Sequence, residues 1–170
     1  SYQASGHWSK EDWAWFDGAA PRLDAIFSAM QSAGFAAFRR DGFDPEHVVA
    51  RVSEPLDGRD STVRVRPGNL TELISAALAR DVKTVDVAIL NGGSLRIDDV
   101  LLAGPITEYD IIRVLPFGGK VLKAAVDGPL LVDILNAGVS NQGTGGFLHP
   151  RGAERKGSDW YVQGQPIDLK

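Results

Sequence analysis

Cysteine is absent from the 170 residues of this sequence. Disulfides, thiolate metal sites and thiol nucleophiles are therefore excluded, and the redox compartment cannot be inferred. Histidine is nearly as scarce, since only His7, His47 and His149 occur. Because a metal centre needs three or four convergent donors, we expect His47 at the surface and His149 in a structural or solvent-facing position. We assign no catalytic residue, no metal ligand and no cofactor to this chain.

Positive charge is also limited, with 18 Lys and Arg residues against 22 Asp and Glu residues and a net charge of -4. Nucleic-acid binding depends on neutralising phosphates, so it is disfavoured as the main function, although a local basic pocket is compatible with this balance. No run of about 18 apolar residues occurs, which excludes a membrane-spanning helix. The first residues lack the pattern of an export signal, so any such signal would lie outside this sequence.

The length and a hydrophobic content of 44% suit one sizeable core with a small helical appendage. We expect residues 1–50 to form a helical or linker segment that packs on a domain formed by residues 51–170. Ser9 resembles the N-cap of a short first helix, Pro21 can begin a second helix, and Gly34 can end it.

The N-terminal segment is rich in aromatic side chains, namely Trp8, Trp13, Trp15 and Phe16. We interpret them as core residues or as a face between domains. A platform for stacking carbohydrate rings or bases is the alternative.

Strand and helix signals alternate along the rest of the chain, which predicts a mixed α+β fold. Frequent short turns and Asp-Gly pairs argue against a purely parallel sheet. Strands are predicted over 48–52, 63–66, 85–90 and 120–126, with a hairpin around Gly164. Helices are predicted from Asn69, with Glu72 completing a capping box, from Thr107, with Asp110 at N3, and from Pro129 to Gly138. The Asp57-Gly58 pair is predicted to turn through a positive φ.

The segment from Val85 to Gly119 is the candidate ligand-binding wall. Its apolar strand ends at Asn91-Gly92-Gly93, where a tight turn can present backbone N–H groups to a ligand. Arg96 supplies a cation just past that turn. Phe117 is flanked by Pro116 and Gly118, which would hold its ring on a loop.

Arg64 and Arg66 lie two residues apart in the alternating Val63-Arg64-Val65-Arg66 segment, so both would share one face of a strand. One interpretation is a solvent-washed edge strand protected by charge. The other is that both guanidinium groups converge with Arg96 on a phosphate. The glycine-rich loop over 141–148 is only a weak phosphate-binding signal, because it lacks the Lys-Ser/Thr pair of a P-loop.

Taken in order, these pieces resemble the C-terminal, substrate-binding domain of the 5'-nucleotidase family, which includes UDP-sugar hydrolases and related nucleotide phosphoesterases. The resemblance spans residues 56–165, and it is the order and spacing of the pieces that make it specific. The pieces are Leu56-Asp57-Gly58-Arg59 with Val63-Arg64, the helix from Asn69, Asn91-Gly92-Gly93-Ser94-Leu95-Arg96, Gly104-Pro105-Ile106-Thr107, Leu115-Pro116-Phe117-Gly118-Gly119, Asp127-Gly128 and Gly146-Phe147-Leu148. The resemblance implies a four-layer α/β/β/α arrangement with short mixed sheets.

The resemblance also implies roles for individual residues. Asn91 and Arg96 would contact a nucleotide, Phe117 would stack on its base, and Arg64 or Arg66 would help to bind phosphate or sugar. The implied substrate-binding set is Asn91, Gly92, Arg96, Phe117, Gly118, Arg64 and Arg66. The partner would be a nucleotide or nucleoside, and the family's second stacking aromatic has no counterpart before Lys170, which suggests a domain truncated at its C-terminal end.

Hydrolysis in this family resembles two-metal chemistry, and the divalent metals are expected only in an N-terminal metallophosphoesterase domain absent from this sequence. We therefore expect the chain to recognise nucleotides without hydrolysing them. A second hypothesis is a non-catalytic module that binds a protein through its aromatic N-terminal face. A third is that the chain is itself a complete phosphatase. The resemblance alone suggests a periplasmic or extracellular location.

Overall fold

A computed structural model describes residues 10–82 and 84–170, including all of their side chains except those of residues 10–17. The chain divides into two compact units, residues 1–45 and residues 46–170. The aromatic side chains predicted to pack in the core or between domains include Trp8, which lies outside the described residues. The side chains of Trp13 and Trp15 are not among those that the structure describes.

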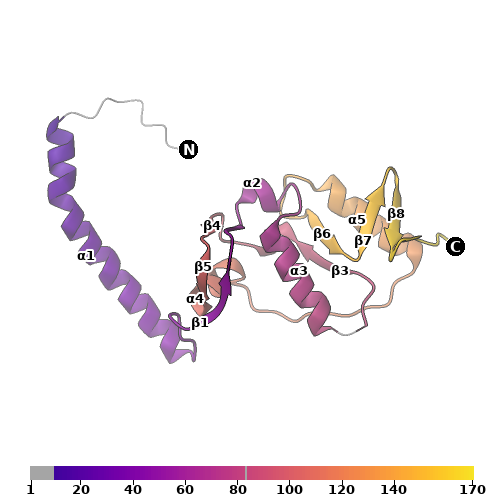
Figure 1. Ribbon diagram of the computed structural model, residues 1–170, viewed down its shortest axis with the longest axis horizontal. Coiled ribbons are helices and arrows are strands. Elements are labelled where there is room, and N and C mark those ends of the chain that lie inside the picture. Colours follow the sequence, from indigo (N-terminus) through magenta and orange to yellow (C-terminus); the bar gives the residue numbers. More distant parts are fainter. Residues whose placement is uncertain (1–9, 83) are drawn as a thin grey trace. The chain divides into compact units, whose positions relative to one another are not determined.

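The described part of the first unit contains one helix, α1 (Lys10–Arg40) (Figure 1). The prediction of two helices is wrong, because Pro21 lies inside α1 and Gly34 does not end it. No capping side chain directly precedes Pro21, and Gly34 is surrounded by Ala33, Ala36 and Ala37, which favour a continuous helix. The helix ends where Gly42 has a φ of +90° and the Phe43 N–H donates to the Phe38 carbonyl at 3.0 Å, the hydrogen-bond pattern of a Schellman motif.

The second unit combines short antiparallel strand pairs with helices, which confirms the predicted α+β class. The strands pair as β1 (Val48–Val52) with β5 (Gly104–Thr107), β2 (Leu56–Asp57) with β4 (Val100–Leu101), and β3 (Ala88–Asn91) with β6 (Leu148–Arg151). A meander follows, formed by β7 (Ala153–Lys156), β8 (Asp159–Val162) and β9 (Gln165–Pro166). The predicted hairpin around Gly164 is confirmed, with a φ of +78° at that glycine.

The helices of this unit are α2 (Asp60–Val63), α3 (Asn69–Asp81), α4 (Glu108–Val114) and α5 (Gly128–Ser140). Helix α3 lies along β3 and β6, and α5 contacts β6 (Figure 1). The core is apolar and includes Leu56, Val63, Leu70, Leu90, Leu95, Leu101, Ile106 and Val114. The turn that follows β3 is therefore anchored to the core on both sides, by Leu90 and Leu95.

The start of α4 matches the predicted capping chemistry, and the start of α5 has a cap that was not predicted. The Thr107 hydroxyl accepts from the Asp110 N–H at 3.3 Å, and the Asp110 carboxylate accepts from the Thr107 N–H at 2.9 Å. The Asp127 carboxylate accepts from the Leu130 N–H at 2.9 Å, with Pro129 in the first turn of α5. These bonds satisfy helix N–H groups that lack intrahelical partners.

The capping of α3 differs from the prediction, because Gly68 and not Asn69 is the N-cap. The Thr71 hydroxyl lies 2.9 Å from both the N–H and the carbonyl of Gly68. Asn69 instead accepts from the Asp57 N–H at 3.0 Å and donates to the Pro55 carbonyl at 2.8 Å. Its side chain thus ties the start of α3 to β2.

Two predicted strands do not form. Residues 60–63 are the short helix α2, and residues 120–126 are exposed with no strand pairing. Four alternating residues are too few to decide a period, and hydrogen bonds from local polar side chains favour a helical turn at α2. A strand over 120–126 would need a neighbouring strand to bond with.

Two predicted roles of glycine are also wrong. Gly58 has no positive φ, and it is needed because a Cβ there would collide with the Ile97 side chain. Gly138 does not end α5, which continues to Ser140. A Cβ at Gly138 would lie 2.6 Å from Leu148, so this glycine lets α5 approach β6 closely.

Candidate functional site

The Asn91-Gly92-Gly93 turn is packed against the glycine-rich loop that precedes β6. The Gly92 N–H donates to the Phe147 carbonyl at 2.7 Å, and the Gly93 N–H donates to the Gly145 carbonyl at 2.8 Å. The prediction that this turn presents those N–H groups to a ligand is therefore wrong. Gly92 instead permits close packing, because a Cβ there would collide with the Val63 carbonyl.

Asn91 keeps an exposed side chain at the end of β3. Its Nδ2 donates to the Gly145 carbonyl at 3.2 Å, and its Oδ1 accepts from the Ser94 hydroxyl at 2.5 Å. These two bonds fix the orientation of the amide. An amide has two N–H groups and two lone pairs, so Asn91 retains capacity to bind a ligand.

Arg96 and Phe117 are brought together by a backbone bond. The Arg96 N–H donates to the Val114 carbonyl at 3.0 Å, at the end of α4 and three residues before Phe117. The Arg96 guanidinium carbon lies 5.7 Å from the centre of the Phe117 ring, which is cation–π range. Both side chains are exposed, Phe117 by 69%. Gly118, beside the ring, is exposed with nothing within 4 Å of its Cβ position.

Arg64 is the second predicted cation that lies beside the turn, since a Cβ on Gly92 would be 3.5 Å from the Arg64 Cα. Its guanidinium pairs with Asp60 at 2.7 Å, and its buried Nε has no partner within the described structure. Arg66 is exposed, and its backbone N–H donates to the Thr62 carbonyl at 3.0 Å. The two arginines are not side by side on a strand face, because the segment is not a strand.

The glycine-rich loop joins the Arg64 segment to the turn, a role that sequence reasoning missed. The Gly143 N–H donates to the Arg64 carbonyl at 2.7 Å, with a φ of +87° at Gly143. The Gln142 side chain donates to the Val65 carbonyl at 2.7 Å. A positive φ favours glycine, so the glycine content of this loop was the available signal.

Asp57 and Arg59 form a second structural feature that the sequence reasoning did not assign. Arg59 binds the Asp57 carboxylate through its Nε at 2.9 Å and its Nη2 at 2.8 Å, and the Thr62 hydroxyl donates to the same carboxylate at 2.8 Å. The bidentate hydrogen bonds from Arg59 hold the pKa of Asp57 well below its usual range. These hydrogen bonds fix the start of α2, the short helix that ends directly before Arg64.

His149 is buried, with 3% of its surface exposed, so of the two positions predicted for it the structural one is observed and the solvent-facing one is not. Its Nε2 lies 2.6 Å from the Val63 carbonyl oxygen. Burial lowers the pKa of His149. His47 is exposed and lies 2.8 Å from a Glu108 carboxylate oxygen, a surface pair that agrees with its predicted position.

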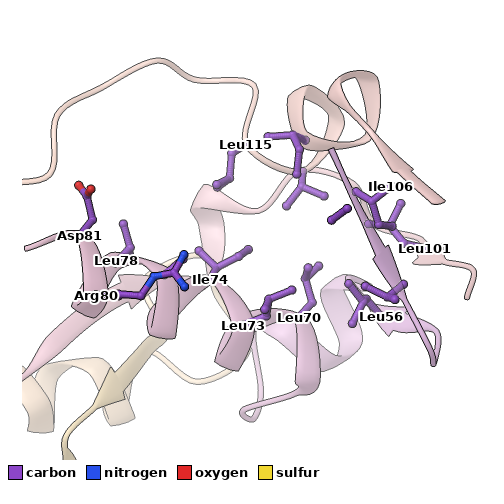
Figure 2. A pocket seen from close by; sticks show the side chains of 15 residues that line it. Leu56, Leu70, Leu73, Ile74, Leu78, Arg80, Asp81, Leu101, Ile106 and Leu115 are labelled. Atoms are coloured by element: carbon purple, nitrogen blue, oxygen red, sulfur yellow. The ribbon is translucent and has the colours of Figure 1, made fainter. Parts of the chain in front are cut away.

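An apolar cleft of about 710 Å³ lies in the described part of this unit. Leucine, isoleucine and other aliphatic side chains of α3, α4 and the neighbouring strands line it, and Figure 2 shows Arg80 and Asp81 at one end of the row. None of the predicted substrate-binding residues belongs to its lining. With one cation beside one carboxylate, the cleft offers a phosphate no concentrated positive charge.

Within residues 10–82 and 84–170, no group of three or more His, Cys, Asp or Glu side chains is arranged to hold a metal ion. No helix in the described part of the chain combines the length and apolar composition that crossing a bilayer requires. The candidate site of this chain consists of Asn91 and Arg64 beside the turn at Gly92, together with the pair formed by Arg96 and Phe117.

Comparison with known proteins identifies the family to which this chain belongs. The sequence model described as "5'-nucleotidase, C-terminal domain" matches residues 48–165. The chain belongs to the 5'-nucleotidase C-terminal domain family. The family resemblance predicted from the ordered motifs is thus confirmed, and the matched residues contain every member of the candidate site.

Relatives and solved structures agree with this family. The chain is 30% identical over 156 residues to the silent protein UshA(0) of Salmonella typhimurium, covering 87% of this chain and 26% of that protein. It is 34% identical over 88 residues to a 5'-nucleotidase of Vibrio cholerae, covering 52% of this chain and 15% of that protein. A 5'-nucleotidase precursor from Thermus thermophilus has the same fold, with a TM-score of 0.61 at 24% identity, covering 87% of this chain and 30% of that one. The chain therefore spans a minor part of these relatives' length.

Proposed function

We propose that this chain is the nucleotide-recognising domain of a 5'-nucleotidase-like hydrolase. The proposal is based on the pair formed by Arg96 and Phe117. Both side chains are exposed, and the Arg96 guanidinium carbon lies 5.7 Å from the centre of the Phe117 ring. A guanidinium binds phosphate oxygens through parallel hydrogen bonds, and an aromatic face stacks on a base. The two ends of a nucleotide thus have complementary groups on adjacent loops.

The ring geometry supports this division of roles. A ring has two faces, and the Arg96 guanidinium lies over one of them. With 69% of Phe117 exposed, its other face is open to a base. Asn91 adds an oriented amide that can pair with a sugar hydroxyl or a base edge. Stacking on one side of a base contributes roughly 1 to 3 kcal/mol, so we expect weak, millimolar binding by this chain.

Phosphoester hydrolysis would be carried out by a metal-dependent domain of the whole protein, by analogy with the relatives named 5'-nucleotidase. The binding residues described above include no general base and no metal ligand, so the role of this chain would be to orient the substrate. The family relationship is also the only support for a periplasmic or extracellular location, which we propose on that basis.

A thermal shift series tests this proposal directly. AMP, UDP-glucose and adenosine are each titrated to millimolar concentration against the chain, with inorganic phosphate as the control ligand. We expect AMP to raise the melting temperature more than adenosine or phosphate alone, because it engages both Arg96 and Phe117. No stabilisation by any nucleotide, in this chain or in a longer one, would refute the proposal.

A protein-interaction module is the second candidate function. Helix α1 carries apolar side chains at helical spacing that are exposed by 38 to 65%, namely Leu23, Ile26, Phe27 and Met30. An exposed apolar stripe of this kind is typical of an interaction surface. Substitution of Phe27 and Met30 by serine that abolishes a co-purifying complex, with nucleotide binding unchanged, would support this function.

A further inference from the structure

His149 contacts the strand, the loop and the helix that support the candidate site. It is on β6, paired with Leu90 of β3, and its ring makes an edge contact with Phe147 at 5.1 Å between ring centres. Its Nε2 lies 2.6 Å from the Val63 carbonyl oxygen. Because a carbonyl only accepts, Nε2 carries the proton and donates.

The Val63 carbonyl packs against the Gly92 turn. It is the group that a Cβ on Gly92 would strike, and Val63 itself is fully buried. The next residue is Arg64, whose own carbonyl accepts from Gly143 at 2.7 Å. The hydrogen bond from His149 therefore fixes the Val63 carbonyl, which packs against the Gly92 turn and directly precedes Arg64 in the chain.

We propose that His149 is a positioning residue for the nucleotide site. Its Nε2–H fixes the Val63 carbonyl and thereby sets the Gly92 turn and the Arg64 backbone, without touching the ligand. The inference rests on the proposed nucleotide-binding function. It assigns a buried side chain to that site, through a contact that spans 86 positions of the chain.

The other ring nitrogen provides a matched control. Nδ1 of His149 and the hydroxyl of Ser75 are buried without a partner in the described structure, and both residues line a small cavity of about 250 Å³. Glu72 of α3 and Arg151 of β6 also line this cavity. A change at Ser75 alters the cavity without removing the bond to Val63.

The test compares His149→Gln with His149→Asn in the full chain. The Gln amide nitrogen can take the place of Nε2 and donate to Val63, whereas the Asn amide nitrogen takes the place of Nδ1 and faces the cavity. Ser75→Ala is the control. Near-UV circular dichroism establishes that each variant is folded. AMP affinity and amide hydrogen exchange at Gly92 and Gly143 are then measured.

We expect His149→Asn to weaken AMP binding roughly tenfold and to speed exchange at both amides by a similar factor, since a buried carbonyl loses its donor. His149→Gln and Ser75→Ala should stay close to the wild type. Equal exchange and equal affinity in the Gln and Asn variants would overturn the inference. If the wild type itself binds no AMP, the proposed function fails, and the exchange rates alone decide the positioning role.

Discussion

The Arg96 guanidinium carbon and the Phe117 ring centre lie 5.7 Å apart, on two loops that are 21 positions apart in the chain. The bond from the Arg96 N–H to the Val114 carbonyl, at 3.0 Å, holds these loops together. A cation and an aromatic face are thus adjacent at the surface, with Asn91 on the turn that leads to Arg96. This relationship is the basis of the predictions for ligand binding.

Phe117→Ala should weaken the binding of both AMP and adenosine by roughly 5- to 100-fold, because each loses a base-stacking surface. Arg96→Ala should weaken AMP more than adenosine, because only AMP carries a phosphate. Isothermal titration calorimetry measures both ratios. Arg155→Ala is a matched control, since Arg155 also lies over an aromatic ring, that of Trp160 at 6.0 Å. An equal loss of AMP affinity in the Arg155 variant would contradict the assignment.

Asp60→Asn should tighten AMP binding by a few-fold, because it removes a carboxylate that pairs with Arg64 at 2.7 Å. Arg64 would then be free to bind a phosphate oxygen, and the local negative charge would fall. Affinity is measured at low and high salt, with Asp133→Asn on the exposed surface of α5 as the control. An unchanged AMP affinity in the Asp60 variant would show that Arg64 does not bind the phosphate.

Gly92→Ala should destabilise the second unit by about 1 to 3 kcal/mol, because the added methyl group would overlap the Val63 carbonyl. Urea unfolding measures the change in free energy. Gly119→Ala is the matched control, since nothing lies within 4 Å of its Cβ position. A Gly92 variant as stable as the Gly119 variant would show that the turn does not pack as described.

Asp57→Asn should lower stability near neutral pH and flatten the acid limb of the stability curve. The Asp57 pKa in the folded state is depressed, chiefly by hydrogen bonds from Arg59, so the folded state binds fewer protons than the unfolded state. Its contribution is present above the ordinary pKa of an aspartate and is lost as the pH falls below it. Unfolding free energies from pH 7 down to acid pH, with Asp133→Asn as the control, test this. If the unfolding free energy falls with pH at the same slope in the wild type and in both variants, the role of Asp57 is contradicted.

The cap of α4 could be predicted from the sequence, because Thr107 and Asp110 are close in the chain and depend on no distant contact. The helix from Pro129 and the strand over 48–52 were predicted for similar reasons. The cap predicted for α3 was wrong, because the Asn69 side chain bonds to Pro55 and Asp57 instead. The strand predicted over 63–66 failed because Asp57, which binds Thr62, and Asp98, which accepts from the Asp60 N–H at 2.8 Å, favour a helical turn there.

The sequence predicted which loops carry the candidate site residues, but it did not predict the contacts between those residues. Arg96 and Phe117 follow from ordered motifs, whereas the pairing of Arg64 with Asp60 depended on the α2 turn. The N–H groups of Gly92 and Gly93 are taken by carbonyls that lie over 50 positions away in sequence. No local pattern reports such a contact, so the turn's role in packing required the structure.

An NMR titration of the isotopically labelled chain with AMP tests nucleotide recognition most directly. We predict saturable shifts at millimolar AMP that are confined to the amides of residues 91–96, 117–118 and 64, and that need a higher AMP concentration to saturate in the Phe117→Ala variant. Shifts confined to the apolar cleft, around Ile74 and Leu78 of α3, or no shifts at all, would contradict nucleotide binding at this site.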